Sequence, residues 1–190
     1  MVKAPWNYTK KKTTLYQERN EEKRAEFKKQ LERLDPETLV YVDEAGVDNR
    51  LFREYGRAPK GQKILANIPG RKRERYSIIA GLINKKLIAP FTFQGGCRAE
   101  VFNAWLKHIL IPELKPGMTI IMDNAAFHKS AETKRLIEEA GCFLLFLPTY
   151  SPDFNKIEHW WHKVKSLLRP LLQKPYESLE KLIWGCLLTC

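Results

Sequence analysis

The chain has 190 residues, a length that suits one domain of ordinary size. With 44% hydrophobic residues it can bury a sizeable core, which excludes intrinsic disorder of the whole chain. A net charge of +11 favours a polyanionic partner, nucleic acid or an anionic membrane surface, although a basic surface kept for solubility would give the same charge.

Membrane, secreted and zinc-binding classes are disfavoured by the pattern of the chain. No apolar run approaches the roughly 18 residues that span a bilayer, and the N-terminal "MVKAPWNYTKKKTT" has no apolar stretch of a secretory signal. The four cysteines form no C-x-x-C pair and share no zinc spacing with the four histidines. We therefore expect a cytoplasmic protein with free thiols and no membrane partner.

The first part of the chain predicts one helix and one strand. Residues 18–34 are strong helix formers with a thin apolar stripe, which indicates a mostly solvated helix that leans on the domain. The stretch "TLVYVDEAG", residues 38–46, is rich in strand formers and closes on glycine. Residues 46–75 are irregular and basic.

A hairpin and a helix are predicted next. Strand formers at residues 76–84 and 87–94 flank Lys85-Lys86, and this arrangement predicts a β-hairpin. Residues 97–110, "CRAEVFNAWLKHIL", repeat their apolar side chains with a helical period.

Strands and helices alternate in the second half. The pattern predicts a buried strand in "MTIIMD" (118–123), a helix over 130–140 and another buried strand in "CFLLFLP" (142–148). Ser130 is the expected N-cap of the helix between them, and Gly141 its stop. A helix from about 154 to 168 follows, and the tail carries a last helix whose apolar residues pack on the domain or on a second subunit.

This order of elements predicts an α/β fold with a mixed central sheet and helices on both faces. We expect three segments: a basic linker and helix over residues 1–36, the main domain over 37–172 and a helical tail over 173–190. The chain has no Gly-rich phosphate-binding loop of either common type.

Three acidic residues stand where a core would not tolerate them unpaired. Asp43 interrupts the first strand, on the face shared by Tyr41 and Ala45. Asp123 ends the "MTIIMD" strand, and Glu158 stands near the start of the following helix. If the first strand and "MTIIMD" are neighbours, Asp43 and Asp123 lie side by side beyond the strand ends, where ligands collect in open sheets.

Two interpretations of these acids remain open at this point. Carboxylates placed close together repel one another unless a cation compensates, and oxygen-only ligands favour a hard ion such as Mg²⁺. Two such ions can clamp the attacking and leaving oxygens of a phosphoryl displacement. Alternatively, Asp123 is a turn residue, Asp43 pairs with a surface arginine and Glu158 is a first-turn acid favoured by the helix dipole.

The spacing of the acids points to a known family. Asp123 and Glu158 are separated by 34 residues, within the pattern "DNAAFHKS … LPTYSPDFNKIEHWW", and Asp43 lies in "VYVDEAG". Over roughly residues 10–172 this ordered set resembles the DDE transposase domain of the mariner superfamily, in its bacterial insertion-sequence branch. Asp43, Asp123 and Glu158 match the first, second and third acids of that family.

The resemblance implies a ribonuclease-H-like fold in which the three acids are catalytic and bind two Mg²⁺ or Mn²⁺ ions. It implies cleavage of transposon ends by activated water, then strand transfer by the freed 3′-hydroxyl into a TA target. The implied partners are double-stranded DNA, both transposon ends and target, and a second copy in a homodimer; the protein would be nucleoid-associated. One position departs from the family pattern, because Lys156 stands where proline is usual in the first turn of the helix.

Several basic residues are candidates for DNA contact, with ordinary solvent exposure as the alternative. Two follow Asp123 closely, three share the helix face of Glu158, and three lie in the basic segment before the hairpin: His128 and Lys129; His162, Lys165 and Arg169; Arg71, Lys72 and Arg73. Two other acids are expected to stay outside the site. Strand alternation turns Glu44 away from Asp43, and Asp153 lies in the turn before the helix.

The resemblance leaves more than one function open. Similar full-length transposases place helix-turn-helix DNA readers before the catalytic domain, so we expect a catalytic part with a separate upstream helix-turn-helix reading frame, or a truncated remnant. The alternative to a working transposase is a non-catalytic DNA-binding or dimerising remnant. A host nuclease with the same fold is a weaker third possibility.

Overall fold

The computed structural model describes residues 18–51, 59, 61–63, 65, 70 and 73–189. One sheet has the strand order β3-β2-β1-β4-β5. The pairs β1–β2 and β2–β3 are antiparallel, whereas β1–β4 and β4–β5 are parallel, so the predicted mixed sheet is confirmed. The strands are β1 (Leu39–Asp48), β2 (Arg75–Ile83), β3 (Lys86–Gln94), β4 (Thr119–Met122) and β5 (Phe143–Phe146).

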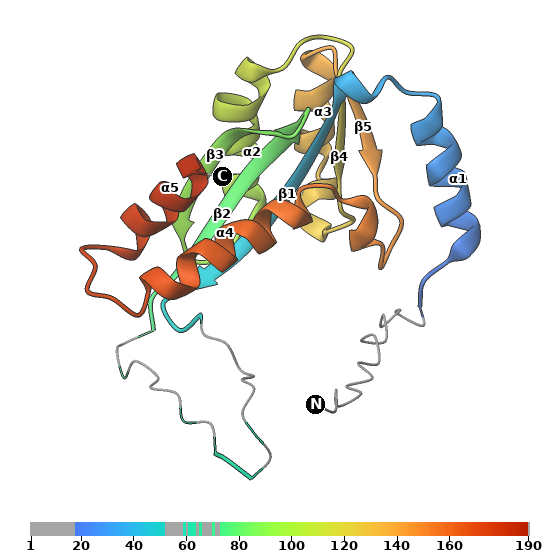
Figure 1. Ribbon diagram of the computed structural model, residues 1–190. Coiled ribbons are helices and arrows are strands. Elements are labelled where there is room, and N and C mark those ends of the chain that lie inside the picture. Colours follow the sequence, from blue (N-terminus) through green and yellow to red (C-terminus); the bar gives the residue numbers. More distant parts are fainter. Residues whose placement is uncertain are drawn as a thin grey trace.

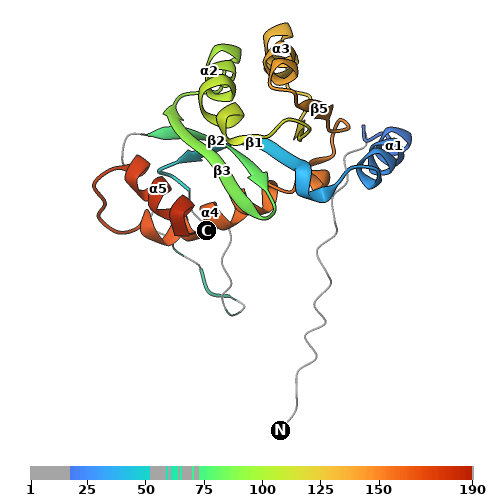
Figure 2. The ribbon, with the colours of Figure 1, turned by 90° about the horizontal axis from the view of Figure 1, so that it is seen from above.

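Helices cover both faces of this sheet, as expected. Helices α2 and α3 lie on one face, α4 and α5 lie on the other, and α1 stands beside the β5 edge (Figures 1 and 2). Helix α2 continues through a π-helical turn, Leu106–Leu110. The helices are α1 (Glu21–Glu32), α2 (Ala99–Trp105), α3 (Ala131–Glu139), α4 (Glu158–Leu171) and α5 (Leu179–Thr189).

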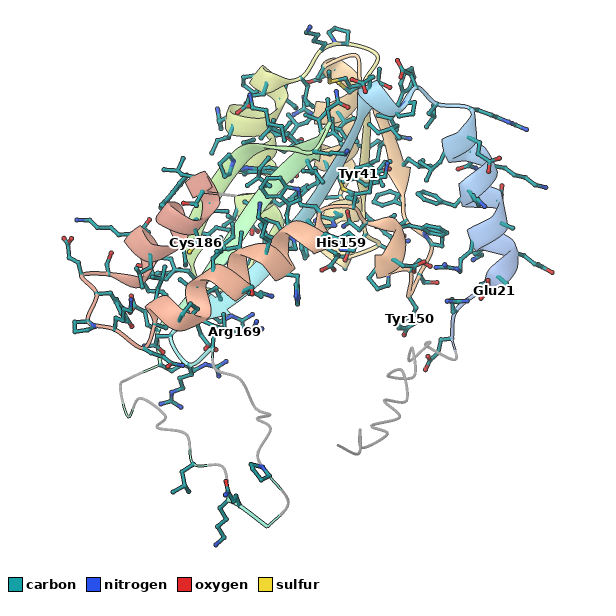
Figure 3. The ribbon with its side chains drawn as sticks, in the orientation of Figure 1. Glu21, Tyr41, Tyr150, His159, Arg169 and Cys186 are labelled. Carbon is teal, nitrogen blue, oxygen red and sulfur yellow. The ribbon has the colours of Figure 1, made fainter. Side chains whose placement is uncertain are left out.

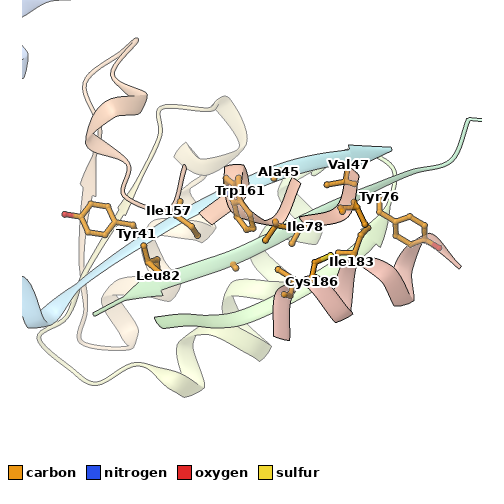
Figure 4. Close-up of a cluster of buried hydrophobic side chains, with 14 of the residues drawn as sticks. Tyr41, Ala45, Val47, Tyr76, Ile78, Leu82, Ile157, Trp161, Ile183 and Cys186 are labelled. Carbon is orange, nitrogen blue, oxygen red and sulfur yellow. The ribbon is translucent and has the colours of Figure 1, made fainter. Parts of the chain in front are cut away.

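Alternation along the strands divides the apolar side chains between two cores. Tyr41 and Ala45 of β1 belong to the core beneath α4 and α5, as the sequence predicted for the face of Asp43. Val40 and Val42 belong to the core beneath α2 and α3. Figure 4 shows the first core, in which Trp161 of α4 lies over the sheet. Burial of these apolar faces is the main force that holds the layers together.

The tail is part of the first core. Leu179, Ile183, Cys186 and Leu187 of α5 are buried there with the apolar face of α4. The last helix therefore packs on the domain, the first of the two arrangements that its apolar residues allowed.

Local signals in the sequence placed several boundaries correctly. The predicted hairpin is present, although its turn is Asn84-Lys85, one residue before the expected Lys85-Lys86; both turn residues have positive φ (49° and 62°), which matches the right-handed twist of the flanking strands. The Ser130 side chain accepts from the Thr133 backbone N–H and caps α3. Gly141 has a φ of 69° and ends that helix.

Two predictions about the second half were wrong in part. The strand in "CFLLFLP" is not fully buried: β5 pairs only with β4 at the sheet edge, and Phe143 is 63% exposed. Helix α4 begins at Glu158 rather than near residue 154, because Pro152–Phe154 forms a separate 3₁₀ turn. Glu158 is thus the first residue of the helix.

Candidate metal and nucleic-acid site

The three acidic residues converge where β4 ends beside the middle of β1, and they come from three different parts of the chain. Strands β1 and β4 are parallel, and Tyr41 pairs with Ile121. Two residues beyond this pair, Asp43 and Asp123 line the same cavity, as expected if the two strands are neighbours. Glu158 opens α4, which crosses that side of the sheet.

A single cavity collects the three side chains. It has a volume of about 370 Å³, and its remaining wall comes from the segment that joins β5 to α4 together with Asn124. In Figure 3, Tyr150 lies on this joining segment, and Arg169 marks the far part of α4. The lining residues besides the acids are Asn124, residues 147–152 and Asn155.

Asp43 is the most confined of the three acids. The Trp161 indole Nε1–H donates to its Oδ2 over 2.9 Å. Burial, together with the charges of Glu158 and Glu44, raises the pKa of the Asp43 carboxyl to about 7. Its negative charge is therefore only partly compensated within the protein. Trp161 is also buried in the core, so it has two roles, and helical periodicity could not reveal the bond to Asp43.

Asp123 has a different environment. It accepts from the Ala125 backbone N–H over 2.9 Å and from His128 Nδ1 over 2.7 Å. The hydrogen bond from His128 lowers the pKa of the Asp123 carboxyl below its ordinary value. At neutral pH Asp123 is thus ionised whereas Asp43 is only partly ionised, and the two carboxyl groups differ in their charge.

The structure corrects the expectations for His128 and Glu44. His128 is fully buried, so its side chain does not face a DNA backbone. Its Nε2 lies 3.0 Å from Glu44 Oε1, on the face opposite Asp43. Glu44 is turned away from Asp43, as strand alternation predicts, yet its contact with His128 connects it to Asp123. Burial alone would lower the pKa of His128, but the bonds to Asp123 and Glu44 outweigh it and raise the pKa to about 9.

Glu158 is presented by an intact first helical turn. Its backbone N–H donates to the Asn155 carbonyl over 3.2 Å, although Lys156 occupies the position where the family pattern has proline. The Lys156 ammonium lies 5.1 Å from the centre of the Tyr41 ring, a cation–π contact that holds the side chain against the sheet. The departure at Lys156 therefore does not displace the glutamate from the cavity.

The wall of the cavity is anchored to the rest of the domain. Asp153 is bonded to Arg24 of α1 at 2.6 and 2.9 Å, so this acid pairs with a cation and lies outside the cavity, as expected. Asn124 Nδ2 donates to the Leu147 carbonyl. Asn155 Nδ2 donates to the Val42 carbonyl over 3.4 Å, while its Oδ1 is buried with no hydrogen-bond partner among the described atoms.

The donor set fits a hard divalent cation. The cavity offers carboxylate oxygens from three acids and the unpartnered amide oxygen of Asn155 in its wall. Within residues 18–51 and 73–189, no group of three His, Cys, Asp or Glu side chains could hold an ion as it stands. This does not conflict with Mg²⁺, which usually binds one or two carboxylates and completes its shell with waters and substrate phosphates.

The other candidates for DNA contact are placed as follows. Lys129 is exposed, and its ammonium lies 6.0 Å from the centre of the Phe146 ring. His162 is exposed on α4, and Lys165 and Arg169 are half-buried along the same helix. Arg73 is exposed and pairs with Asp48 at 3.0 Å. Arg71 and Lys72 lie outside the described residues.

The fold and the site together define a class of protein: a ribonuclease-H-like domain whose carboxylates gather where β4 ends beside the middle of β1. Within that class the chain belongs to the DDE superfamily endonucleases, whose family model matches residues 38–183. The resemblance stated from Asp43, Asp123 and Glu158 is thereby confirmed at the level of the family.

Solved structures and a curated relative are consistent with this assignment. The chain superposes on the Mos1 transposase paired-end complex with the left transposon end with a TM-score of 0.70, at 12% identity over 97% of this chain and 63% of that one. The catalytic domain of the Mos1 mariner transposase gives 0.53, at 13% identity over 87% and 83%. The insertion element IS630 uncharacterized 39 kDa protein of Shigella sonnei is 27% identical over 146 residues, which are 74% of this chain and 42% of that protein.

The chain thus spans less than half the length of this insertion-element relative. Among the described helices, none is both long enough and apolar enough to cross a bilayer.

Proposed function

We propose that this chain is the catalytic domain of a transposase, which cleaves the DNA at transposon ends in a reaction that depends on Mg²⁺ or Mn²⁺ and joins the freed ends to target DNA. The observation that carries the proposal is the convergence of Asp43, Asp123 and Glu158 on one cavity, in a chain of the DDE superfamily endonucleases.

In this proposal, Asp43, Asp123 and Glu158 hold two divalent ions. Bound there, the ions would polarise the scissile phosphate and lower the pKa of an attacking water. The chain itself supplies the geometry: Trp161 restrains the Asp43 carboxylate, and the first turn of α4 presents Glu158. The half-exposed Asp123 completes the ligand set at the mouth of the cavity.

Two successive displacements at phosphorus account for the reaction. In the first, a water oxygen bonds to phosphorus, the bond to the 3′-oxygen breaks, and that oxygen takes up a proton. In the second, the freed 3′-hydroxyl loses its proton and attacks a phosphodiester of the target, whose own 3′-oxygen leaves and is protonated. One carboxylate-lined cavity serves both steps, because each is an in-line exchange of oxygens at a phosphodiester.

The positive charge of the chain provides the means to hold DNA. Lys129 lies close to Asp123, and His162, Lys165 and Arg169 extend from Glu158 along α4. Contacts of this kind position the duplex through its phosphates and carry no sequence information directly. We propose these residues, with Arg71, Lys72 and Arg73, as phosphate contacts, and double-stranded DNA ends and a TA target as the partners. We further propose that two copies of the chain act together.

A nicking assay tests the proposal. Supercoiled plasmid carrying the DNA that flanks the gene is incubated with the protein and Mn²⁺, beside the variants Asp123→Asn and Asp48→Asn. Asp48 lies at the end of β1 and pairs with Arg73, so its variant makes the same chemical change outside the cavity. We expect nicking by the wild type and by Asp48→Asn, and at least a hundredfold less by Asp123→Asn. Equal nicking by Asp123→Asn would refute the assignment, and DNA binding without nicking by the wild type would favour a non-catalytic remnant.

A further inference from the structure

Asp123 depends on side-chain contacts for its orientation. Strand β4 ends at Met122, so Asp123 lies beyond the hydrogen-bond ladder of the sheet, and its side chain is 51% exposed. The bond from the Ala125 backbone N–H fixes one carboxylate oxygen within its own turn. The remaining link to the protein interior is His128 Nδ1, 2.7 Å from the same oxygen.

His128 cannot move without disturbing the core. Its ring centre lies 4.4 Å from that of Phe102 and 4.3 Å from that of Phe127, and the side chain has no exposed surface. Phe102 is itself fully buried in α2. The aromatic neighbours therefore fix the plane of the imidazole, and the hydrogen bonds at its two nitrogens fix its rotation.

Glu44 holds the other side of the ring. It follows Asp43 in β1, points to the opposite face of the sheet, and its Oε1 lies 3.0 Å from His128 Nε2. Ionised carboxylates only accept hydrogen bonds, so both ring nitrogens must donate when both acids are charged. The adjacent Cys97 contributes no charge, because burial and the proximity of Glu44 raise the pKa of its thiol to about 12.

We propose that Glu44 and His128 form a positioning pair that holds Asp123 in the orientation needed to bind a metal ion. The dipeptide Asp43-Glu44 would then have two tasks: Asp43 enters the cavity from one face of β1, while Glu44 acts from the other face, through His128, on the acid beyond β4. The role of Asp123 as a ligand rests on the proposed function. The claim that Glu44 and His128 fix the position of Asp123 does not depend on the proposed function.

The arrangement resembles the way in which outer hydrogen bonds commonly orient metal ligands in proteins. Partners of this kind, which do not touch the ion, change metal affinity by about 10–100-fold when they are removed. Glu44→Ala leaves His128 Nε2 buried without an acceptor, so the imidazole is expected to tilt and to release Asp123. Glu44→Gln keeps an oxygen that can accept from Nε2, and should therefore preserve the position of Asp123.

Crystal structures of the metal-free variants, combined with calorimetric Mn²⁺ titration, test the proposal. Glu180→Ala is the matched control, because Glu180 is also half-buried and accepts a hydrogen bond, from Thr92 Oγ1 at 3.1 Å, but it lies on α5. We expect Glu44→Ala to turn the Asp123 carboxylate away from its wild-type position and to weaken Mn²⁺ binding by about 10–100-fold. Glu44→Gln and Glu180→Ala should retain both the position and the affinity, the latter within about threefold.

The proposal is overturned if Asp123 keeps its position in Glu44→Ala and binds Mn²⁺ as in the wild type. If Glu44→Ala does not fold, His128→Gln replaces it as the test variant. The glutamine amide can reach only one of the two carboxylates, so the connection between Glu44 and Asp123 is broken in this variant as well. A wild-type protein that neither binds Mn²⁺ nor nicks DNA, while Asp123 still moves in Glu44→Ala, would refute the proposed function and leave the positioning pair standing.

Discussion

Replacing Asp43 by asparagine should stabilise the metal-free protein at neutral and alkaline pH. The pKa of Asp43 is raised from 3.8 to about 7 by burial and by the neighbouring Glu158 and Glu44 carboxylates. A folded state with a raised carboxyl pKa binds more protons than the unfolded state between these values, so its stability falls as the pH rises through that window. Asparagine removes this penalty, and its amide oxygen can still accept from Trp161 Nε1.

The expected size follows from the shift. A tenfold change in acidity corresponds to about 1.4 kcal/mol, so the full penalty above pH 7 is at most about 4 kcal/mol. Water at the mouth of the cavity screens the exposed Glu158 charge, and we therefore expect a gain of about 1–3 kcal/mol in the free energy of unfolding. In a domain of this size that gain raises Tm by about 2–12 °C.

Thermal unfolding in EDTA at several pH values measures the effect. The Tm advantage of Asp43→Asn should be largest at pH 8, decline below pH 7 and vanish near pH 3, where the wild-type carboxyl is protonated in both states. Asp48→Asn makes the same change at the end of the same strand but removes the ion pair with Arg73, so it should be neutral or slightly destabilising. An Asp43→Asn protein no more stable than the wild type at pH 8 would refute the reasoning.

Three further predictions concern the frame around the site. Asp153→Asn should cost about 1–2 kcal/mol at pH 7, because it breaks a half-buried pair; since the bond from Arg24 lowers the pKa of Asp153, the cost should shrink in urea titrations as the pH falls below 3.8, the ordinary pKa of this carboxyl. Ile183→Ala should destabilise the domain by about 2–4 kcal/mol in the same titrations, because Ile183 is fully buried, and a loss below about 1 kcal/mol would mean that α5 is dispensable. Lys156→Pro should change Tm by less than about 3 °C and leave nicking intact, because Lys156 lies before the helix and Asn155 is already extended, as the residue before a proline must be; a large loss of nicking would show that the lysine has its own function.

The sequence predicted those features that depend on periodicity and chain order. Alternation placed Asp43 with Tyr41 and Ala45, and the approach of Asp43 and Asp123 was expected on the condition that "MTIIMD" lies beside the first strand, which it does. These features are local, or follow from the rule that parallel strands end at one edge of a sheet. A single amino-acid sequence is therefore enough to predict them.

The features that were missed depend on what meets a side chain from another element. Strand alternation correctly predicted that Glu44 points away from Asp43. It could not show that His128, 84 residues further along the chain, lies on the opposite face of the sheet and contacts Glu44. For the same reason His128 was expected at the surface, although Phe102 and Phe127 bury it. The apolar run of β5 does not reveal its place at the sheet edge, because strand order is a property of the whole fold.

Calorimetric titration with Mn²⁺ tests the central claim most directly, because it asks whether three carboxylates from three elements act as one site. We expect the wild type to bind Mn²⁺, and each of Asp43→Asn, Asp123→Asn and Glu158→Gln to weaken that binding at least tenfold, with Asp48→Asn unchanged. Wild-type affinity in a protein that carries all three cavity substitutions would contradict the account.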